Sequence, residues 1–109
     1  MTYKEVAEMV KSIGLPFAYY QFPEDTEEAP PYVVYFYLYN DDLMADNENY
    51  QQIPTLNIEL YTDDKDFELE AAVEKVLKQH GLTYYKEENH IDSEKLFQIA
   101  YEMEVIING

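Results

Sequence analysis

The sequence predicts an α+β fold: a single domain over residues 1–109, in the order α-β-β-β-α-β-β, with two helices on one face of a mainly antiparallel sheet. Two observations support this fold class. Residues 2–14 and 63–81 have the apolar spacing of amphipathic helices, and residues 54–62 alternate as a strand with one covered face does. Because the strands between the helices can pair as hairpins, both helices should cover the same face and leave the other face open.

The first helix is predicted over residues 2–14. Thr2 and Glu5 have the spacing of a capping box, in which each side chain accepts a hydrogen bond from the other residue's backbone N–H. Gly14 can take the left-handed conformation that ends a helix, and Pro16 prevents its continuation. The apolar stripe of this helix consists of Val6, Met9, Val10 and Ile13.

Three strands are predicted next, over residues 16–22, 32–40 and 54–62. An acidic loop bounded by prolines, residues 23–31, separates the first two. Residues 41–53 show no sustained period, and a connection of this length is often functional or mobile. We read it either as a simple acidic hairpin tip or as an arm whose Leu43 and Met44 dock on a partner.

Residues 31–40, PYVVYFYLYN, contain four tyrosines and no charge. We expect Val34, Phe36 and Leu38 to face the helices. The open face would then receive Val33, Tyr35, Tyr37 and Tyr39, beside Asn57, Glu59, Tyr61, Gln98, Glu102 and Glu104. Tyrosine is common at protein interfaces because it joins a large apolar area to a polar tip, but it is also common in ordinary strands. Both interpretations stay open; the candidate subunit interface is Tyr35, Tyr37, Tyr39, Tyr61, Leu43 and Met44.

The second half begins with a helix predicted over residues 63–81. Acidic residues crowd its first turn, whereas Lys75, Lys78 and His80 lie near its end, where they complement the helix dipole. Two strands follow over residues 82–88 and 95–107, joined by a turn around residues 89–94. The core stripe of the helix consists of Leu69, Val73, Val76 and Leu77.

The charge is strongly acidic: 23 Asp and Glu face seven lysines and no arginine, giving a net charge of −16. Such a chain repels phosphates, so we expect neither sequence-specific binding of nucleic acid nor membrane binding. The absence of cysteine excludes disulfides and thiolate chemistry. The charged N-terminal residues are unlike a signal peptide, and we expect a soluble intracellular product or a part assembled inside a cell.

Catalytic and metal sites have little support in the sequence, and we expect no enzyme and no cofactor. Three glycines, at 14, 81 and 109, cannot build a phosphate-binding loop. His90 is surrounded by carboxylates, so an acid–base or metal site is conceivable, but a solvated histidine is favoured. Residues 41–49, DDLMADNEN, lack the central glycine and the ligand spacing of a calcium loop.

Two stretches of the chain resemble the tail-terminator (tail-completion, or head–tail joining) proteins of long-tailed phages and prophages. Within residues 56–107 the cues are the strand end -ELYT, the helix start -DKDFELE-, and the segments -GLTYYK-, -IDSEKLFQI- and -YEMEV-. The opening -KEVAEMVKSIGLPFAYYQF- is similar to the first helix and strand of that family. The likeness rests on fold pattern and spacing rather than on a catalytic signature.

This resemblance implies a non-enzymatic minor structural protein of the virion tail, assembled in the cytoplasm of the host bacterium. Such proteins form a ring, typically six-fold, that ends polymerisation of the tail tube and presents a surface to the head's connector. DNA later passes through the lumen. The implied partners are further copies of the chain, the tail tube protein and the head-completion (connector) protein.

The clustered acids fit this role, because carboxylates lining a channel repel phosphates and keep the duplex from sticking. The candidate residues of the lumen or rims are Glu24, Asp25, Glu27, Glu28, Asp41, Asp42, Asp46 and Glu48. An alternative of another class is an acidic DNA mimic that inhibits a DNA-binding defence enzyme. A mimic should spread its carboxylates over one face, whereas the acids here cluster in loops and at helix starts.

Overall fold

A computed structural model describes residues 1–40, 43–45 and 48–108, and the side chains of residues 1–38 and 52–108. It confirms the α+β class and the predicted order of the main elements. Two short strands are added within residues 41–53, where the sequence shows no sustained period. The elements are α1 (Tyr3–Ser12), β1 (Phe17–Tyr19), β2 (Tyr32–Asn40), β3 (Leu43–Ala45), β4 (Glu48–Gln51), β5 (Pro54–Thr62), α2 (Phe67–Gln79), β6 (Tyr85–Ile91) and β7 (Leu96–Glu104).

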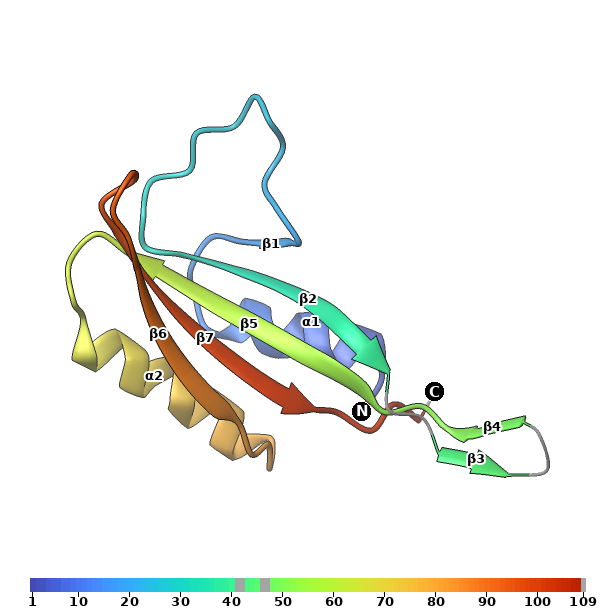
Figure 1. Cartoon of the computed structure of the whole chain (residues 1–109). Coiled ribbons are helices and arrows are strands. Elements are labelled where there is room, and N and C mark those ends of the chain that lie inside the picture. Colours follow the sequence, from blue (N-terminus) through green and yellow to red (C-terminus); the bar gives the residue numbers. More distant parts are fainter. Residues whose placement is uncertain (41–42, 46–47, 109) are drawn as a thin grey trace.

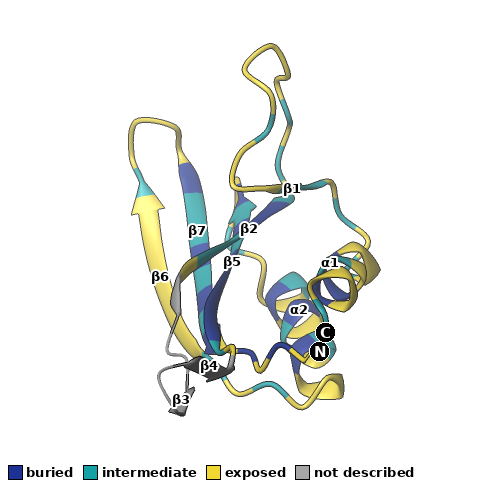
Figure 2. Ribbon diagram, turned by 90° about the vertical axis from the view of Figure 1, so that its right-hand side faces the viewer, coloured by how far each residue is buried: buried dark blue, intermediate teal, exposed yellow. Residues whose placement is uncertain are grey.

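Five strands form the main sheet in the order β1-β2-β5-β7-β6, and β3 pairs with β4 in a separate hairpin. The short β1 runs parallel to β2, and the other neighbours are antiparallel. The β3–β4 hairpin extends past one end of the sheet, and we call it the arm (Figure 1). Both helices lie on one side of the sheet, as predicted (Figure 2).

The helix α1 begins with the predicted capping box. The Glu5 backbone N–H donates to the Thr2 hydroxyl at 3.1 Å, and the Thr2 N–H donates to the Glu5 carboxylate at 3.0 Å. Its apolar stripe is buried at Val6, Met9 and Val10. Gly14 then takes a φ of +87°, so the chain leaves the helix without the strain a side chain would bring.

The helix α2 begins four residues later than residue 63, because the Asp66 carboxylate caps it by accepting from the Leu69 N–H at 3.0 Å. Val73 and Leu77 are fully buried against the sheet. Gly81 has a φ of +71° and ends the helix region as predicted. The residues before Asp66 therefore form the connection from β5 rather than the first helical turn.

The hairpin of β6 and β7 is displaced from its predicted position. β6 spans Tyr85–Ile91 instead of 82–88, so His90 lies in a strand and not in a turn. The turn falls at residues 92–95, between the paired Ile91 and Leu96. Lys95 ends the turn with a φ of +55°. Glycine usually marks this conformation in a sequence, and this stretch contains no glycine.

The face assignment expected for β2 is wrong. In the antiparallel register Tyr35 lies opposite Ile58 and Tyr37 lies opposite Leu56. Paired residues point to the same side of a sheet, and Leu56 and Ile58 are fully buried beneath the helices. Tyr35 and Tyr37 therefore face the helices.

The apolar residues of β2 lie accordingly on the other face. Val34 pairs with Glu59 and Phe36 with Asn57, while Leu38 is 45% exposed. Val33, which was also expected on the open side, is fully buried in the core opposite Leu60. Successive side chains of a strand point to opposite faces. Assigning one residue of β2 to the wrong face therefore assigned all its other residues to the wrong face as well.

The inward phenols are accommodated by an aromatic cluster at the edge of the core. The Tyr37 ring meets the Tyr3 ring of α1 edge-on at 5.2 Å, and the Tyr35 ring meets the Tyr19 ring of β1 at 5.2 Å. Tyr35 is 9% exposed. Burial raises the pKa of Tyr35, and that of Tyr37 strongly, so both phenols stay neutral.

Candidate functional site

The face of the sheet opposite α1 and α2 carries no helix in the described part of the chain, and we call it the open face (Figure 2). Its members Val34, Thr55 and Asn57 are nevertheless buried among neighbouring side chains. Strand alternation and the observed registers place three or four side chains of each central strand on it. Its described members are Tyr32, Val34 and Phe36 of β2; Thr55, Asn57, Glu59 and Tyr61 of β5; Gln98, Ala100, Glu102 and Glu104 of β7; and Tyr85, Glu87 and Asn89 of β6.

A chain of hydrogen bonds crosses this face from β5 to β6, and we call it the polar row. Glu59 accepts from the Asn57 amide at 3.0 Å and from the Tyr61 hydroxyl at 2.8 Å. The Tyr61 oxygen accepts from the Gln98 amide at 2.8 Å, and the Gln98 oxygen accepts from Asn89 at 3.3 Å. These bonds hold the polar side chains in one arrangement, so a partner would meet a face that is already ordered.

Tyr61 is the central member of the polar row. Burial and the neighbouring Glu59 carboxylate raise its pKa strongly, so it remains a neutral donor at any physiological pH. Its ring stacks on the Tyr32 ring with centroids 5.0 Å apart and planes 16° apart. The sequence-based placement of Tyr61, with Asn57, Glu59, Gln98, Glu102 and Glu104, on the open face is confirmed.

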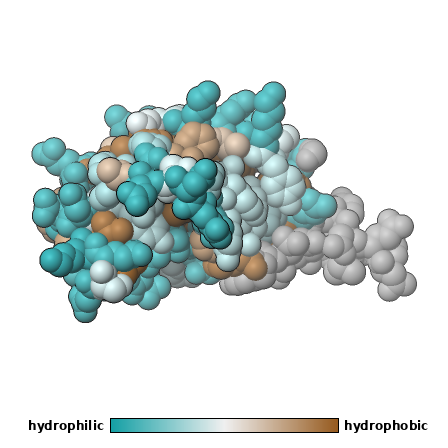
Figure 3. Space-filling model, turned by 90° about the horizontal axis from the view of Figure 1, so that it is seen from above, coloured by the Kyte–Doolittle hydropathy of each residue, from teal (hydrophilic) through white to brown (hydrophobic). Residues whose placement is uncertain are grey.

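One end of the open face carries a hollow of about 300 Å³, which we call the aromatic recess. Its floor includes the stacked Tyr32 and Tyr61, and the loop after β1 and the β6–β7 turn form its walls. Seen from above, the surface is mostly hydrophilic, and the hydrophobic residues gather in small separate spots (Figure 3). Its lining includes Tyr20, Phe22, Glu28, Tyr32, Tyr61 and Glu94.

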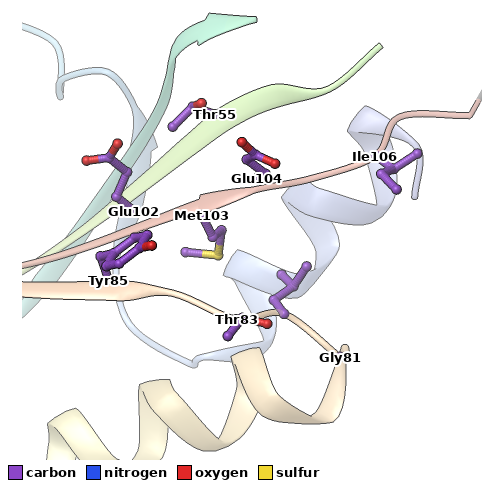
Figure 4. A pocket seen from close by; sticks show the side chains of 9 residues that line it. Thr55, Gly81, Thr83, Tyr85, Glu102, Met103, Glu104 and Ile106 are labelled. Carbon is purple, nitrogen blue, oxygen red and sulfur yellow. The ribbon is translucent and has the colours of Figure 1, made fainter. Parts of the chain in front are cut away.

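The other end carries a hollow of about 480 Å³ where β6 starts beside β7, and we call it the β7 notch. β6 begins at Tyr85, opposite Glu102, so β7 runs on past its neighbour. Figure 4 shows Glu102 and Glu104 on one side of β7 and Met103 on the other. Tyr85 and Ile106 at its edge are 85% and 55% exposed, so the notch combines apolar surface with carboxylates.

A cluster of charges lies on the opposite side, between α2 and β6. Glu70 is only 3% exposed and is paired with Lys65 at 2.6 Å and with Lys86 at 2.9 Å. Lys86 also pairs with Glu74 at 2.8 Å, and Lys65 pairs with Glu88. We call these five residues the lysine–glutamate cluster.

The electrostatics of this cluster favour its charged form. Burial alone would raise the pKa of Glu70, but the hydrogen bonds from Lys65 and Lys86 outweigh it and lower that pKa. The cluster was not predicted from the sequence. The available signal was the four-residue spacing of Glu70 and Glu74, which places both on one side of α2.

The two histidines lie in separate, exposed settings. His90 Nδ1 lies 2.6 Å from an Asp92 oxygen, and its ring meets Phe97 edge-on at 4.8 Å. Within the described part of the chain, no three His, Asp or Glu side chains gather as a metal site would require. His80 instead contacts the Val76 carbonyl at 2.9 Å, at the end of α2. No helix within the described ranges is long and apolar enough to cross a membrane.

The predicted lumen or rim acids fall into two separated groups. The loop between β1 and β2 carries Glu24, Asp25, Glu27 and Glu28, all outside the sheet. Asp41, Asp42 and Asp46 lie outside the described residues, and Glu48 is on β4 with its side chain outside the described part. The loop and the arm lie at opposite ends of β2 (Figure 1), which at about 3.3 Å per residue separates them by roughly 26 Å.

The predicted interface residues are likewise only partly brought together. Tyr61 lies on the open face, and Tyr35 and Tyr37 lie beneath the helices. Leu43 and Met44 are on β3 of the arm, and Tyr39 is near the end of β2; the side chains of all three lie outside the described residues. A role of these residues in a subunit contact stays a prediction.

Comparison with known proteins shows that the fold of this chain is similar to that of a solved structure. No protein-family model matches the chain, and no curated protein matches it. Among solved structures, a chain of the "Virion of native gene transfer agent (GTA) particle" is similar, with a TM-score of 0.62 and 15% sequence identity. The match covers 94% of this chain and 86% of that chain, so nearly all of the chain has a counterpart in fold there.

Proposed function

We propose that this protein is a non-enzymatic structural component of a virion, which caps the tail tube of a long-tailed phage as a ring. The ring ends tube polymerisation and joins the tail to the head. The observation that carries the proposal is the likeness of fold, over 94% of the chain, to a chain of a virion. The sequence resemblance of residues 56–107 to tail terminators leads to the same class of protein independently of that comparison.

The form of the molecule supports assembly into a ring. A closed ring of identical subunits uses heterologous contacts, so each subunit must offer two different surfaces. The open face, which includes Tyr61, is one such surface, and the projecting arm with Leu43 and Met44 is another. We propose that the arm of one subunit, or the end of the tail tube, packs against the open face of the next.

The acids have a separate proposed role. The loop between β1 and β2 and the arm lie at opposite ends of β2 (Figure 1), so one narrow lumen would receive one of the two groups and a rim the other. In the lumen, carboxylates would repel the phosphates of passing DNA. The ring would thus conduct DNA without binding it.

The test is to mix the protein with its tail tube protein and measure tube lengths by electron microscopy. Capped tubes of limited length, bearing a ring at one end, are the expected result. Unrestricted tube growth at stoichiometric excess of the protein contradicts the proposal. The DNA-mimic alternative predicts instead a complex with a DNA-binding defence enzyme that added duplex DNA displaces.

A further inference from the structure

The aromatic recess is large enough to receive a side chain of a partner. Its volume of about 300 Å³ is at the lower end of the range for ligand pockets, about 300–1,000 Å³. It opens on the same face as the polar row, and Tyr61 belongs to both. A group that enters the recess therefore comes from a partner lying on the open face.

Several aromatic rings surround this hollow. Tyr32 stacks on Tyr61, and the Phe22 ring meets Tyr32 edge-on at 5.4 Å. The Tyr20 ring lies edge-on to Phe36 at 5.8 Å, so it extends over the open face. Aromatic faces carry negative potential and attract a Lys or Arg side chain within about 6 Å of the ring centre.

Carboxylates add to this attraction. Glu28, in the loop after β1, and Glu94, in the β6–β7 turn, both line the recess. Burial and then the charge of Glu94 raise the pKa of Tyr32, so the field of Glu94 reaches the floor of the recess. Among the described residues the lysine ion pairs belong to Lys65 and Lys86 on the helix side. Lys95 follows Glu94 in the turn, but it is not part of the recess lining.

The backbone of Tyr20 is held in an unfavourable conformation. Its φ of +68° is left-handed, which is costly for a residue with a bulky side chain, and such strain is concentrated at functional sites. The Tyr20 N–H donates to the Tyr35 carbonyl at 2.8 Å, which fixes this turn. The ring remains 64% exposed and therefore accessible to a partner.

We infer that the aromatic recess binds a Lys or Arg side chain of a different protein that docks on the open face. The cation lies between Glu28 and Glu94 and over the tyrosine rings, while its aliphatic stem packs on Val34 and Ile91. This inference deepens the proposed function, on which the identity of the partner rests. It assigns the partner a basic docking segment.

Electrostatics favour a different protein as the partner over a nucleic acid or a second copy of the chain. A nucleic acid would bring phosphates to a chain with a net charge of −16. The arm of a second copy contains no lysine or arginine, so a neighbouring subunit that packs through its arm brings no cation to the recess. A partner with a basic segment meets complementary charge at the recess and along the carboxylates of the open face.

The experiment is an NMR titration of the full chain labelled with ¹⁵N. The probes are N-acetyl-lysine methylamide and N-acetyl-arginine methylamide, with N-acetyl-norleucine methylamide as the uncharged isostere. We expect saturable shifts of the amides of Tyr20, Phe22, Tyr32, Tyr61 and Glu94 with the two cations. Norleucine binding of equal strength, or shifts spread evenly over the acidic surface, overturns the inference.

Variants locate the site. Glu94→Gln should weaken binding of both cations by roughly two- to fivefold, the range of an exposed ion pair. Tyr20→Asn should also weaken binding without lowering Tm, because Asn tolerates the left-handed backbone but lacks the ring. Glu8→Gln on the exposed side of α1 removes the same charge far from the recess and should leave binding unchanged.

Two further results would contradict the inference. An equal effect of Glu8→Gln and Glu94→Gln shows general charge attraction rather than a site. Shifts of the same amides on raising protein concentration alone show that a second copy occupies the recess. The titration does not depend on ring assembly. A negative titration would therefore not contradict the capping of tail tubes, and a failure to cap tubes would not contradict cation binding in the recess.

Discussion

The Tyr101 hydroxyl donates a hydrogen bond of 2.7 Å to the Glu74 carboxylate, joining β7 to α2 beside the lysine–glutamate cluster. Tyr101 is fully buried, and its ring meets Tyr84 edge-on at 5.2 Å. Burial and the nearby Glu74 charge raise the pKa of Tyr101 strongly, so the phenol stays a donor. Through this bond and the Lys86 pairs, α2 is tied to the last two strands of the sheet.

Removing the charge of Glu70 should destabilise the fold. Glu70→Gln leaves Lys65 and Lys86 without their buried partner, although these lysines are 23% and 38% exposed and water partly compensates. We expect the free energy of unfolding to fall by about 1–2 kcal/mol, measured by urea denaturation. Glu68→Gln, at an exposed position of the same helix, is the matched control and should change stability by less than about 0.5 kcal/mol.

The same variant isolates the pH dependence of the cluster. The pKa of Glu70 is lowered in the folded protein from its ordinary value of 4.5. A carboxyl group whose pKa is lower in the folded than in the unfolded protein stabilises the fold at pH values above its unfolded pKa. This stabilisation is lost as the pH falls through the folded pKa. The stability difference between wild type and Glu70→Gln should be constant from pH 7 to about 5 and shrink below pH 4.5. Taking the difference between the two proteins cancels the repulsion among the other carboxylates, which both proteins share. A stability difference that grows as the pH falls would contradict a lowered pKa of Glu70.

Tyr37 and Tyr61 should respond oppositely to loss of the hydroxyl. The buried Tyr37 oxygen has no hydrogen-bond partner among the described residues, whereas the Tyr61 hydroxyl donates to Glu59 and accepts from Gln98. Tyr37→Phe should therefore be neutral or stabilise by up to about 1 kcal/mol, and Tyr61→Phe should destabilise by about 1–3 kcal/mol. Thermal unfolding of both variants measures this, and equal losses would show that Tyr37 has a partner.

The sequence predicted those elements whose signals are local. The capping box at Thr2 and Glu5, the alternation of residues 54–62 and the two glycine helix ends all depend on neighbours in the chain. The face of β2 depends on its register with β5, and every residue from Val33 to Tyr37 is apolar or aromatic, so its own alternation carries no signal.

The candidate site was predicted only in part for a related reason. Tyr61 was assigned to the open face because β5 alternates clearly. The aromatic recess joins the loop after β1 (Tyr20 to Glu28) to the end of β6 and the turn after it (Ile91 and Glu94), which lie far apart in the chain. A contact between segments so far apart leaves no periodic pattern in the sequence. The lysine–glutamate cluster likewise pairs α2 with β6 across the fold.

The β6–β7 turn can be stabilised at Lys95. Its φ of +55° is unfavourable for a residue with a Cβ, so Lys95→Gly should raise the free energy of unfolding by about 0.5–1 kcal/mol. Lys95→Ala removes the same charge but keeps the Cβ, so it should give no such gain. Chemical denaturation of the pair measures the backbone effect directly. If both variants gain equally, the charge and not the backbone is responsible.

The arm supplies the sharpest test of ring assembly. Leu43→Ser with Met44→Ser should abolish capping of tail tubes while leaving Tm within about 1 °C, because β3 pairs with β4 in a hairpin outside the five-stranded sheet. The matched control is Phe67→Ser, which removes a 73% exposed apolar side chain at the start of α2 and should leave capping intact. Electron microscopy of tube lengths reads out both variants. Normal capping by the doubly substituted arm would mean that the subunit contact lies elsewhere, and Tyr61→Ser on the open face then becomes the decisive variant.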